Sequence, residues 1–264
     1  DLAQAVDGQY AALGLHPVYL ARHRPQHLDD LRQWLQRLRG ETKLCAVGEI
    51  GLDYYLEHLD RDAQQALFEA QLRLAAEFRL PALIHVRRAH AATIATLKRI
   101  RLERRGIIHA FAGSREEARE YLKLGFRLGL GGAPPWPQAN RLRKVAAELP
   151  AEAIVLETDA PDMAPSMHPG QRNSPEHLPD IGRALADAFQ RAGYRVWASA
   201  RKEDDVRALA EAGFQAVQLD VNDAAALARL AEELGVEAAG LDVLVNNAGY
   251  GAMGPLLDGG VEAM

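Results

Sequence analysis

The sequence lacks several features that mark secreted and membrane proteins. It has one cysteine, Cys45, among 264 residues, which excludes an internal disulfide and favours a reducing compartment such as the cytoplasm. No apolar run approaches the roughly 18 residues that a membrane-spanning helix needs. Residues 1–9 are polar and lack the apolar core of a secretory signal peptide. We therefore expect a cytoplasmic protein without a membrane segment.

No large excess of one charge is present either. The net charge is −5, and a nearly neutral first part offers no basic stripe that would by itself indicate nucleic-acid binding. The distribution is uneven, however. Residues 1–180 contain 24 Lys and Arg against 23 Asp and Glu, whereas residues 181–264 contain 7 against 13. Such asymmetry indicates two parts of separate origin.

Short apolar runs alternate with polar stretches of helical spacing through the first part of the chain. These runs are residues 11–15, 44–50, 81–86, 106–110, 127–130 and 154–157. Continuous apolar strands alternating with helices predict an α/β fold whose parallel sheet is covered on both faces or closed into a barrel. The number of units falls short of the eight in a complete barrel. A doubly wound sheet therefore stays open as an alternative.

After a Pro-, Gly- and Ser-rich stretch at 161–179, which predicts a loop, the alternation resumes. A helix is expected to end over residues 187–193. The strands expected beyond it are 194–200, 215–219 and 241–245, and the helices between them are 206–212 and 224–235.

Acidic and imidazole side chains stand at the ends of the first set of strands: Glu49, Asp53, His85, His109 and Asp159. In a parallel barrel all strand carboxyl ends lie at one face, so these residues would converge. Imidazoles and carboxylates suit Zn²⁺, Mn²⁺ or Mg²⁺, and paired ions can activate water against a phosphoryl group. Each residue alone could equally be a hydrogen-bonded loop residue or a salt-bridging acid. The residue types by themselves leave a metal site and this alternative open.

The motifs VGEIGLDYY, LPALIHVRRAH, GIIHAFAGS and LETDAPDMAP, with GLHP at residues 14–17, resemble those of the TatD-type metal-dependent hydrolases. The resemblance covers about residues 10–180, with the motifs in the family's order. It implies a TIM-like barrel, a binuclear metal site and hydrolysis of phosphodiester bonds, typically in DNA.

The same resemblance assigns roles to individual residues. Glu49 would be a shared catalytic and metal-binding carboxylate, and His85 and His109 would be imidazole ligands. Asp159 would be the catalytic carboxylate at the metal, orienting the attacking water or accepting its proton. The residues that would face the substrate phosphate are His16, Arg87 and Arg88.

This sequence departs from the family pattern at two places. The family has a His-x-His motif at its first strand and a last strand and helix after the region of residue 179, and neither is found here. We therefore expect a truncated barrel that binds one metal weakly, and doubtful activity. Exposed strand edges would also favour aggregation.

A second resemblance begins near Ile181. The strings IGRALADAFQRAGYRVWASARK, VQLDV and LDVLVNNAGYG resemble the short-chain dehydrogenase/reductase family, a Rossmann-like fold, over residues 181–264. It implies a cofactor site, and the presence of Arg201 and Lys202 after the second strand, with no acid at the strand end, favours NADP. The implied cofactor-binding residues are Gly182, Arg201, Lys202, Asp220, Val221, Asn246, Ala248 and Gly249. The segment 246–249 could instead be only a tight turn after a strand. The family's catalytic Ser and Tyr-x-x-x-Lys are not found here, so we expect no reductase chemistry.

These observations predict a chimeric chain made of two fragments. Residues 1–180 would be an incomplete TIM-like hydrolase barrel, and residues 181–264 a partial Rossmann-like segment. The functions considered are a metal-dependent deoxyribonuclease, an NADP-dependent oxidoreductase fragment and a non-catalytic fragment. The sequence does not predict an oligomeric state.

Overall fold

The computed structural model describes residues 2–5, 9–220 and 223–238. Its contacts divide the chain into a first unit, Asp1–Leu130, and a second unit, Gly131–Met264. The predicted family boundary between residues 180 and 181 lies inside one helix, α7 (Leu178–Arg191), and stays a prediction. Among the described residues, no helix combines the length and apolarity needed to cross a bilayer.

Part of the segment that resembles the short-chain dehydrogenase/reductase family lies outside the described residues. This applies to the expected strand 241–245 and to the proposed cofactor residues Val221, Asn246, Ala248 and Gly249.

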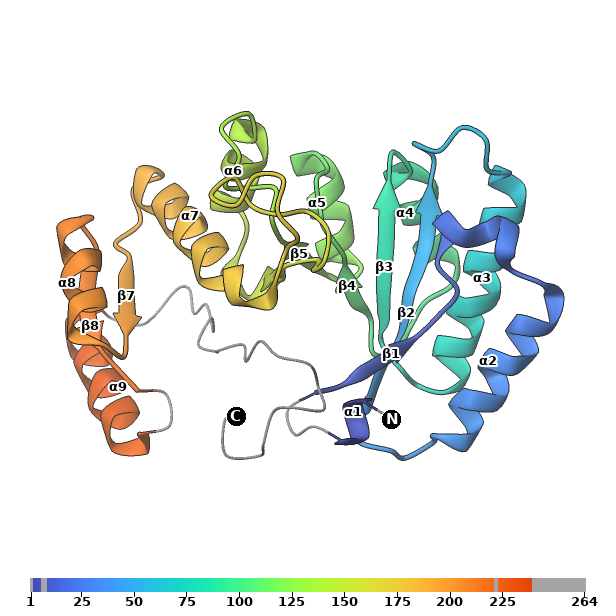
Figure 1. Ribbon diagram of the computed structural model, residues 1–264, viewed down its shortest axis with the longest axis horizontal. Helices are drawn as coiled ribbons and strands as arrows, with labels where there is room; N and C mark the ends of the chain where they lie inside the picture. Colours follow the sequence, from blue (N-terminus) through green and yellow to red (C-terminus); the bar gives the residue numbers. More distant parts are fainter. Residues whose placement is uncertain (1, 6–8, 221–222, 239–264) are drawn as a thin grey trace. The chain divides into compact units, whose positions relative to one another are not determined.

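Parallel strands form the centre of the first unit (Figure 1). They are β1 (Ala11–Leu13), β2 (Leu44–Asp53), β3 (Ala82–Arg87), β4 (Gly106–Ile108) and β5 (Arg127–Leu130). Each strand pairs in parallel with the next one in the sequence. Unbroken sequential order is the winding of a barrel, whereas a doubly wound sheet reverses its order at a switch point. The TIM-like prediction is confirmed over the doubly wound alternative, although the described strands do not close into a barrel.

Helices precede and connect these strands. They are α1 (Leu2–Ala5), η1 (Pro17–Arg22, a 3-10 helix), α2 (Pro25–Arg37), α3 (Arg61–Glu77), α4 (His90–Arg99) and α5 (Arg115–Lys123). Local caps define where they begin. Asp60 accepts a hydrogen bond from the Ala63 N–H at the start of α3, and Ser114 with Glu117 forms a capping box on α5.

The core of the first unit lies between β2 and the helix α3. Ile50 and Leu52 on β2 and Phe68 and Leu72 on α3 have no exposed surface. Burying side chains of this kind stabilises a fold by about 1.5–3 kcal/mol each. β2 is therefore a rigid platform for polar groups at its carboxyl end.

The second unit begins with α6 (Asn140–Ala147), η2 (Ala151–Ala153), β6 (Ile154–Leu156), η3 (Pro175–His177) and α7. Residues 161–174 form the expected irregular loop. The prediction that it extends to residue 179 was wrong, because Pro179 lies in the first turn of α7, where proline is well tolerated. Ile181, Leu185 and Phe189 are the buried face of this helix.

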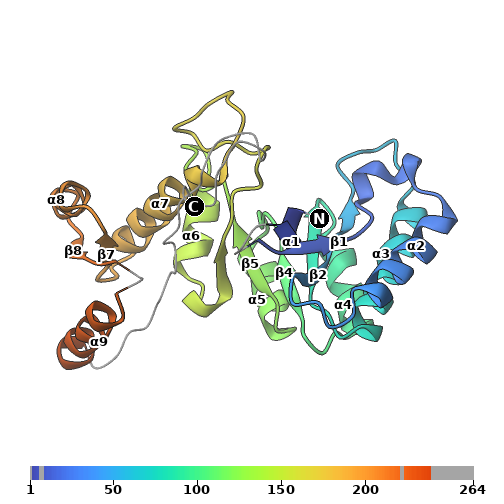
Figure 2. The ribbon, with the colours of Figure 1, turned by 60° about the horizontal axis from the view of Figure 1, so that its bottom comes forward.

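The remaining described elements are β7 (Trp197–Ala200), α8 (Glu203–Glu211), β8 (Gln215–Gln218) and α9 (Ala224–Ala238). β7 and β8 pair in parallel, and α8 packs against both strands (Figure 2). The predicted βα alternation is thus confirmed for this segment. Leu209 and Phe214 are its buried apolar residues within the described part of the chain.

Candidate metal centre

A glycine brings the carboxyl ends of β2 and β3 together. Gly51 is paired with His85 in the sheet and has φ +147°. A Cβ atom at this position would lie 2.0 Å from the His85 carbonyl oxygen, so only glycine allows this approach. Side chains two residues apart along a strand lie on the same face. Glu49 and Asp53 therefore flank the position opposite His85.

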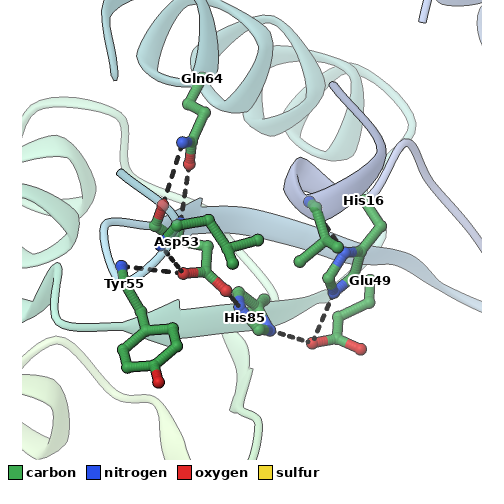
Figure 3. A network of polar contacts seen from close by, with 8 residues as sticks. His16, Glu49, Asp53, Tyr55, Gln64 and His85 are labelled. Carbon is green, nitrogen blue, oxygen red and sulfur yellow. Dashed lines mark hydrogen bonds and ion pairs between the residues drawn. The ribbon is translucent and has the colours of Figure 1, made fainter. Parts of the chain in front are cut away.

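Both carboxylates contact the His85 ring, one on each nitrogen (Figure 3). His85 Nδ1 lies 3.0 Å from Glu49 Oε1, and His85 Nε2 lies 3.0 Å from Asp53 Oδ2. On its other side Glu49 Oε1 is 3.4 Å from Nε2 of His16. Two imidazoles from separate segments thus converge on a single carboxylate oxygen.

The environment of Glu49 keeps it ionised. Burial by itself would raise the pKa of this carboxyl. Hydrogen bonds with His16 and His85, together with the charges of His109 and His85, outweigh burial and hold the pKa of Glu49 well below its usual range. The site therefore presents a carboxylate, the form that can bind a cation.

Asp53 is a site residue that sequence reasoning noticed at the strand end but did not assign. Its side chain is 1% exposed, and Oδ1 accepts hydrogen bonds from the backbone N–H groups of Tyr55 and Leu56 (3.0 and 3.3 Å). Gln64 holds the same residue through its backbone, accepting from the Asp53 N–H and donating to the Asp53 carbonyl. Asp53 could have been assigned to the site from the sequence because it stands four residues after Glu49, on the same face of the strand.

The other predicted residues of the first unit lie around this cluster. His109 follows β4, its backbone N–H donates to the Ile84 carbonyl (2.9 Å), and it is near enough to influence Glu49 electrostatically. The guanidinium groups of Arg87 and Arg88 lie 3.7 and 4.9 Å from the centroid of the half-exposed Tyr55 ring. Two guanidinium groups thus lie against one aromatic ring at the carboxyl end of β3.

Asp159 belongs to the second unit, where it follows β6 and has φ +62°. A buried amide that sequence reasoning missed holds the loop around it. The side-chain amide of Asn173 donates to the carbonyls of Thr158 (2.6 Å) and Asp162 (2.7 Å). Its oxygen accepts from the Ser174 N–H and lies 2.9 Å from His177 Nδ1. Asn173 therefore fixes the backbone on both sides of Asp159.

The described residues of the predicted cofactor set lie in α7 and after the carboxyl ends of the paired strands β7 and β8. Gly182 lies within α7, and Arg201 and Lys202 are exposed between β7 and α8. Asp220 follows β8. Their assignment to a cofactor stays a prediction.

The donor atoms of the first cluster fit a divalent ion. One ligand atom each of His16, Glu49 and His85 lies within 4.8 Å of the others, so a single ion could be contacted by all of them. Nitrogen and carboxylate donors suit Zn²⁺ or Mn²⁺. Glu49 and His85, which the sequence predicted as metal ligands, both belong to this group, and their role as ligands stays a prediction. His16, which was expected at the phosphate, lies directly beside Glu49.

Comparison with known protein families gives two matches. The family described as TatD related DNase matches residues 1–202, and the one described as Enoyl-(Acyl carrier protein) reductase matches residues 179–264. Residues 179–202, which include most of α7, therefore fall within both. This overlap contains the boundary that the sequence predicted between residues 180 and 181.

Individual relatives match the first part of the chain. The uncharacterized metal-dependent hydrolase YjjV of Escherichia coli K12 is 41% identical over 70% of this chain and 71% of its own length. The 3'-5' ssDNA/RNA exonuclease TatD of Klebsiella pneumoniae is 34% identical over 79% of each. The crystal structure of YjjV superimposes with a TM-score of 0.69 over 71% of each chain. A hydrolase of the TatD family from Entamoeba histolytica shares the fold, with 22% identity and a TM-score of 0.58 over 69% of this chain and 68% of its own.

Proposed function

This chain belongs to the family of TatD related DNases, and on that premise we propose that it hydrolyses phosphodiester bonds of DNA with a divalent metal ion. The observation that carries the proposal is the convergence of His16 Nε2 and His85 Nδ1 on Glu49 Oε1. The name of the Klebsiella relative, a 3'-5' ssDNA/RNA exonuclease, favours a single-stranded substrate attacked from its 3' end.

In this proposal Glu49, His85 and His109 hold the ion, and His16, whose Nε2 lies 3.4 Å from Glu49 Oε1, is placed to bind the same ion or the substrate phosphate beside it. The ion supplies polarisation of a phosphoryl oxygen and assistance to the ionisation of water. Asp159 orients the attacking water and accepts its proton. Arg87 and Arg88 bind the substrate phosphate, because guanidinium groups match its geometry and charge.

A cleavage assay with a 5'-labelled single-stranded oligonucleotide tests this function. We expect cleavage with Mn²⁺, Mg²⁺ or Zn²⁺, loss of cleavage after chelation, and a loss of about 100-fold or more in Asp159→Ala. The matched control is Asp162→Ala, which removes an exposed carboxylate from the same loop. No cleavage with any divalent ion, or equal loss in both variants, would contradict the proposal.

A second candidate function concerns residues 179–264. The reductase-family match and the parallel β7–β8 pair with α8 favour descent from a nucleotide-binding fold. The exposed Arg201 and Lys202 would bind the 2'-phosphate of NADP. Titration with NADPH, followed by its fluorescence, tests this. A saturable change would support it, and a flat titration would exclude it.

We further propose that the chain is a fusion of the two parental segments, residues 1–180 and 181–264, and that it resides in the cytoplasm, as its single cysteine favours. A non-catalytic fragment is the remaining alternative. It predicts a non-cooperative thermal melt together with no cleavage and no NADPH binding.

A further inference from the structure

Asp53 stands out among the buried polar groups because it contacts the candidate metal ligand His85 without belonging to the His16–Glu49–His85 group. We propose that Asp53 is a positioning residue that holds the His85 ring in the Nε2–H tautomer, so that Nδ1 is the atom available for the metal. This inference rests on the metal site of the proposed function, and it concerns which nitrogen binds and what selects it.

The hydrogen bonds of Asp53 bear on which ring nitrogen of His85 carries the proton. Its Oδ1 already accepts from the Tyr55 and Leu56 N–H groups, which are permanent backbone donors. Its Oδ2 is directed at His85 Nε2, 3.0 Å away. An ionised carboxylate has acceptors only. Glu49 is an acceptor as well, so a neutral His85 can donate to only one of the two carboxylates. The Asp53 side chain is 1% exposed, and solvent cannot replace a missing donor at its Oδ2, whereas the Glu49 side chain is 27% exposed and also meets His16. The proton of a neutral His85 is therefore assigned to Nε2, where it is donated to Asp53.

This assignment of the proton determines the state of the other ring nitrogen of His85, Nδ1. With its proton on Nε2, neutral His85 presents a lone pair on Nδ1 toward Glu49 Oε1, 3.0 Å away. A lone pair and a carboxylate oxygen at this distance repel each other unless a cation lies between them. The arrangement therefore prepares a cation site. Carboxylates that fix the second nitrogen of a metal-binding histidine are common, and their loss weakens metal binding about 10–100-fold.

Asp53 itself is held rigidly. Gln64, which is fully buried, makes two hydrogen bonds to the Asp53 backbone, and the side chain closes a short turn onto the two following amides. The orientation of the Asp53 carboxylate therefore does not depend on His85 or on a bound ion.

The substitution Asp53→Asn keeps the shape of the side chain and changes only the group that faces His85, from an acceptor to a donor. Its single amide oxygen would stay on the Tyr55 and Leu56 N–H groups, so the amide NH₂ would face His85 Nε2. A donor there favours the opposite tautomer, with the proton on Nδ1, which blocks the metal-binding atom. The matched control is Asp60→Asn, which removes the same charge seven residues later. Asparagine caps a helix as well as aspartate does, so α3 should be retained.

The first readout is spectroscopic and uses the metal-free full chain. Long-range ¹H–¹⁵N correlation spectra, recorded at a pH where His85 is neutral, should show the Nε2–H tautomer in the parent protein and in Asp60→Asn. Asp53→Asn should show Nδ1–H. A parent protein with its proton on Nδ1 would overturn the proposal, and this result needs neither a second variant nor any enzymatic activity.

The second readout is Mn²⁺ affinity measured by calorimetry. We expect Asp53→Asn to bind about 10–100-fold more weakly than the parent, whereas Asp60→Asn should remain within about twofold. Circular dichroism would confirm that both variants are folded. Equal affinity of a folded Asp53→Asn and its control would overturn the proposal. A parent that binds no metal would contradict the proposed function, while its tautomer would still decide the role of Asp53.

Discussion

The two units hold their acidic site residues by different means. In the first unit, Glu49 and Asp53 extend from β2, a strand whose apolar side chains are almost completely buried. In the second unit, Asp159 lies on a loop after the short, half-exposed β6, and the buried amide of Asn173 holds that loop. A strand positions its side chains through the sheet, whereas a loop requires a dedicated polar clamp, because its own backbone groups lack a regular partner.

A further contrast separates β2 from the β7–β8 pair. Parallel strands are normally buried on both faces, as β2 is. The residues of β7 and β8 are half-buried or exposed instead. The described part of the β7–β8 region therefore derives little stability from apolar burial.

The largest expected loss of stability comes from a substitution in the buried core of the first unit, compared with one in the half-buried β8. Phe68→Ala empties a fully buried site on α3 and should cost about 3–5 kcal/mol. Val217→Ala on the half-buried β8 should cost below about 1 kcal/mol. Denaturant unfolding followed by circular dichroism measures both values. Equal destabilisation would show that the β7–β8 region is as tightly packed as the first unit.

An intermediate effect is expected from removing the loop clamp. Asn173→Ala leaves the Thr158 and Asp162 carbonyls and the Ser174 N–H without their side-chain partner, at a cost of about 2–3 kcal/mol. We expect lower cleavage activity with unchanged ligand geometry in the first unit. The control is Arg172→Ala, an exposed neighbour. Melting curves and cleavage assays on both variants would test this, and full activity in Asn173→Ala would show that the clamp is dispensable.

The smallest effect concerns a surface ion pair of the first unit. Hydrogen bonds from Arg99 and Gln65 lower the pKa of Glu69 from 4.5 to about 2. Since the folded pKa is depressed, this contribution is present above about pH 4.5 and is lost as the pH falls toward 2. Solvent screening keeps it small.

Arg99→Ala should therefore lower the melting temperature slightly at pH 7 and by much less near pH 2, where about half of Glu69 is protonated. Arg104→Ala, which removes a charge from an exposed position, is the control. A difference between Arg99→Ala and the parent that persists undiminished at pH 2 would contradict the assignment.

Much of the fold was predictable from local pattern. The apolar run 127–130 coincides with β5, and those at 44–50 and 81–86 lie on β2 and β3, because buried parallel strands are continuous apolar runs. The apolar run stops three residues before the end of β2, since Gly51 and Asp53 interrupt the apolar pattern. That interruption marks the part of the strand where the site is built. The start of α7 was misplaced because proline at a helix start resembles a loop residue.

The sequence by itself determined where the strands lie along the chain, the residues at their ends and the resemblance to a family, because these depend on neighbouring residues and on recognisable motifs. Only the tertiary structure decided that Asp53 holds His85, 32 residues away, and that Asn173 holds the loop around Asp159. Both are contacts of buried polar groups. Such groups need partners, but which partner they meet depends on strand register and on the path of a loop, and neither is encoded in local periodicity.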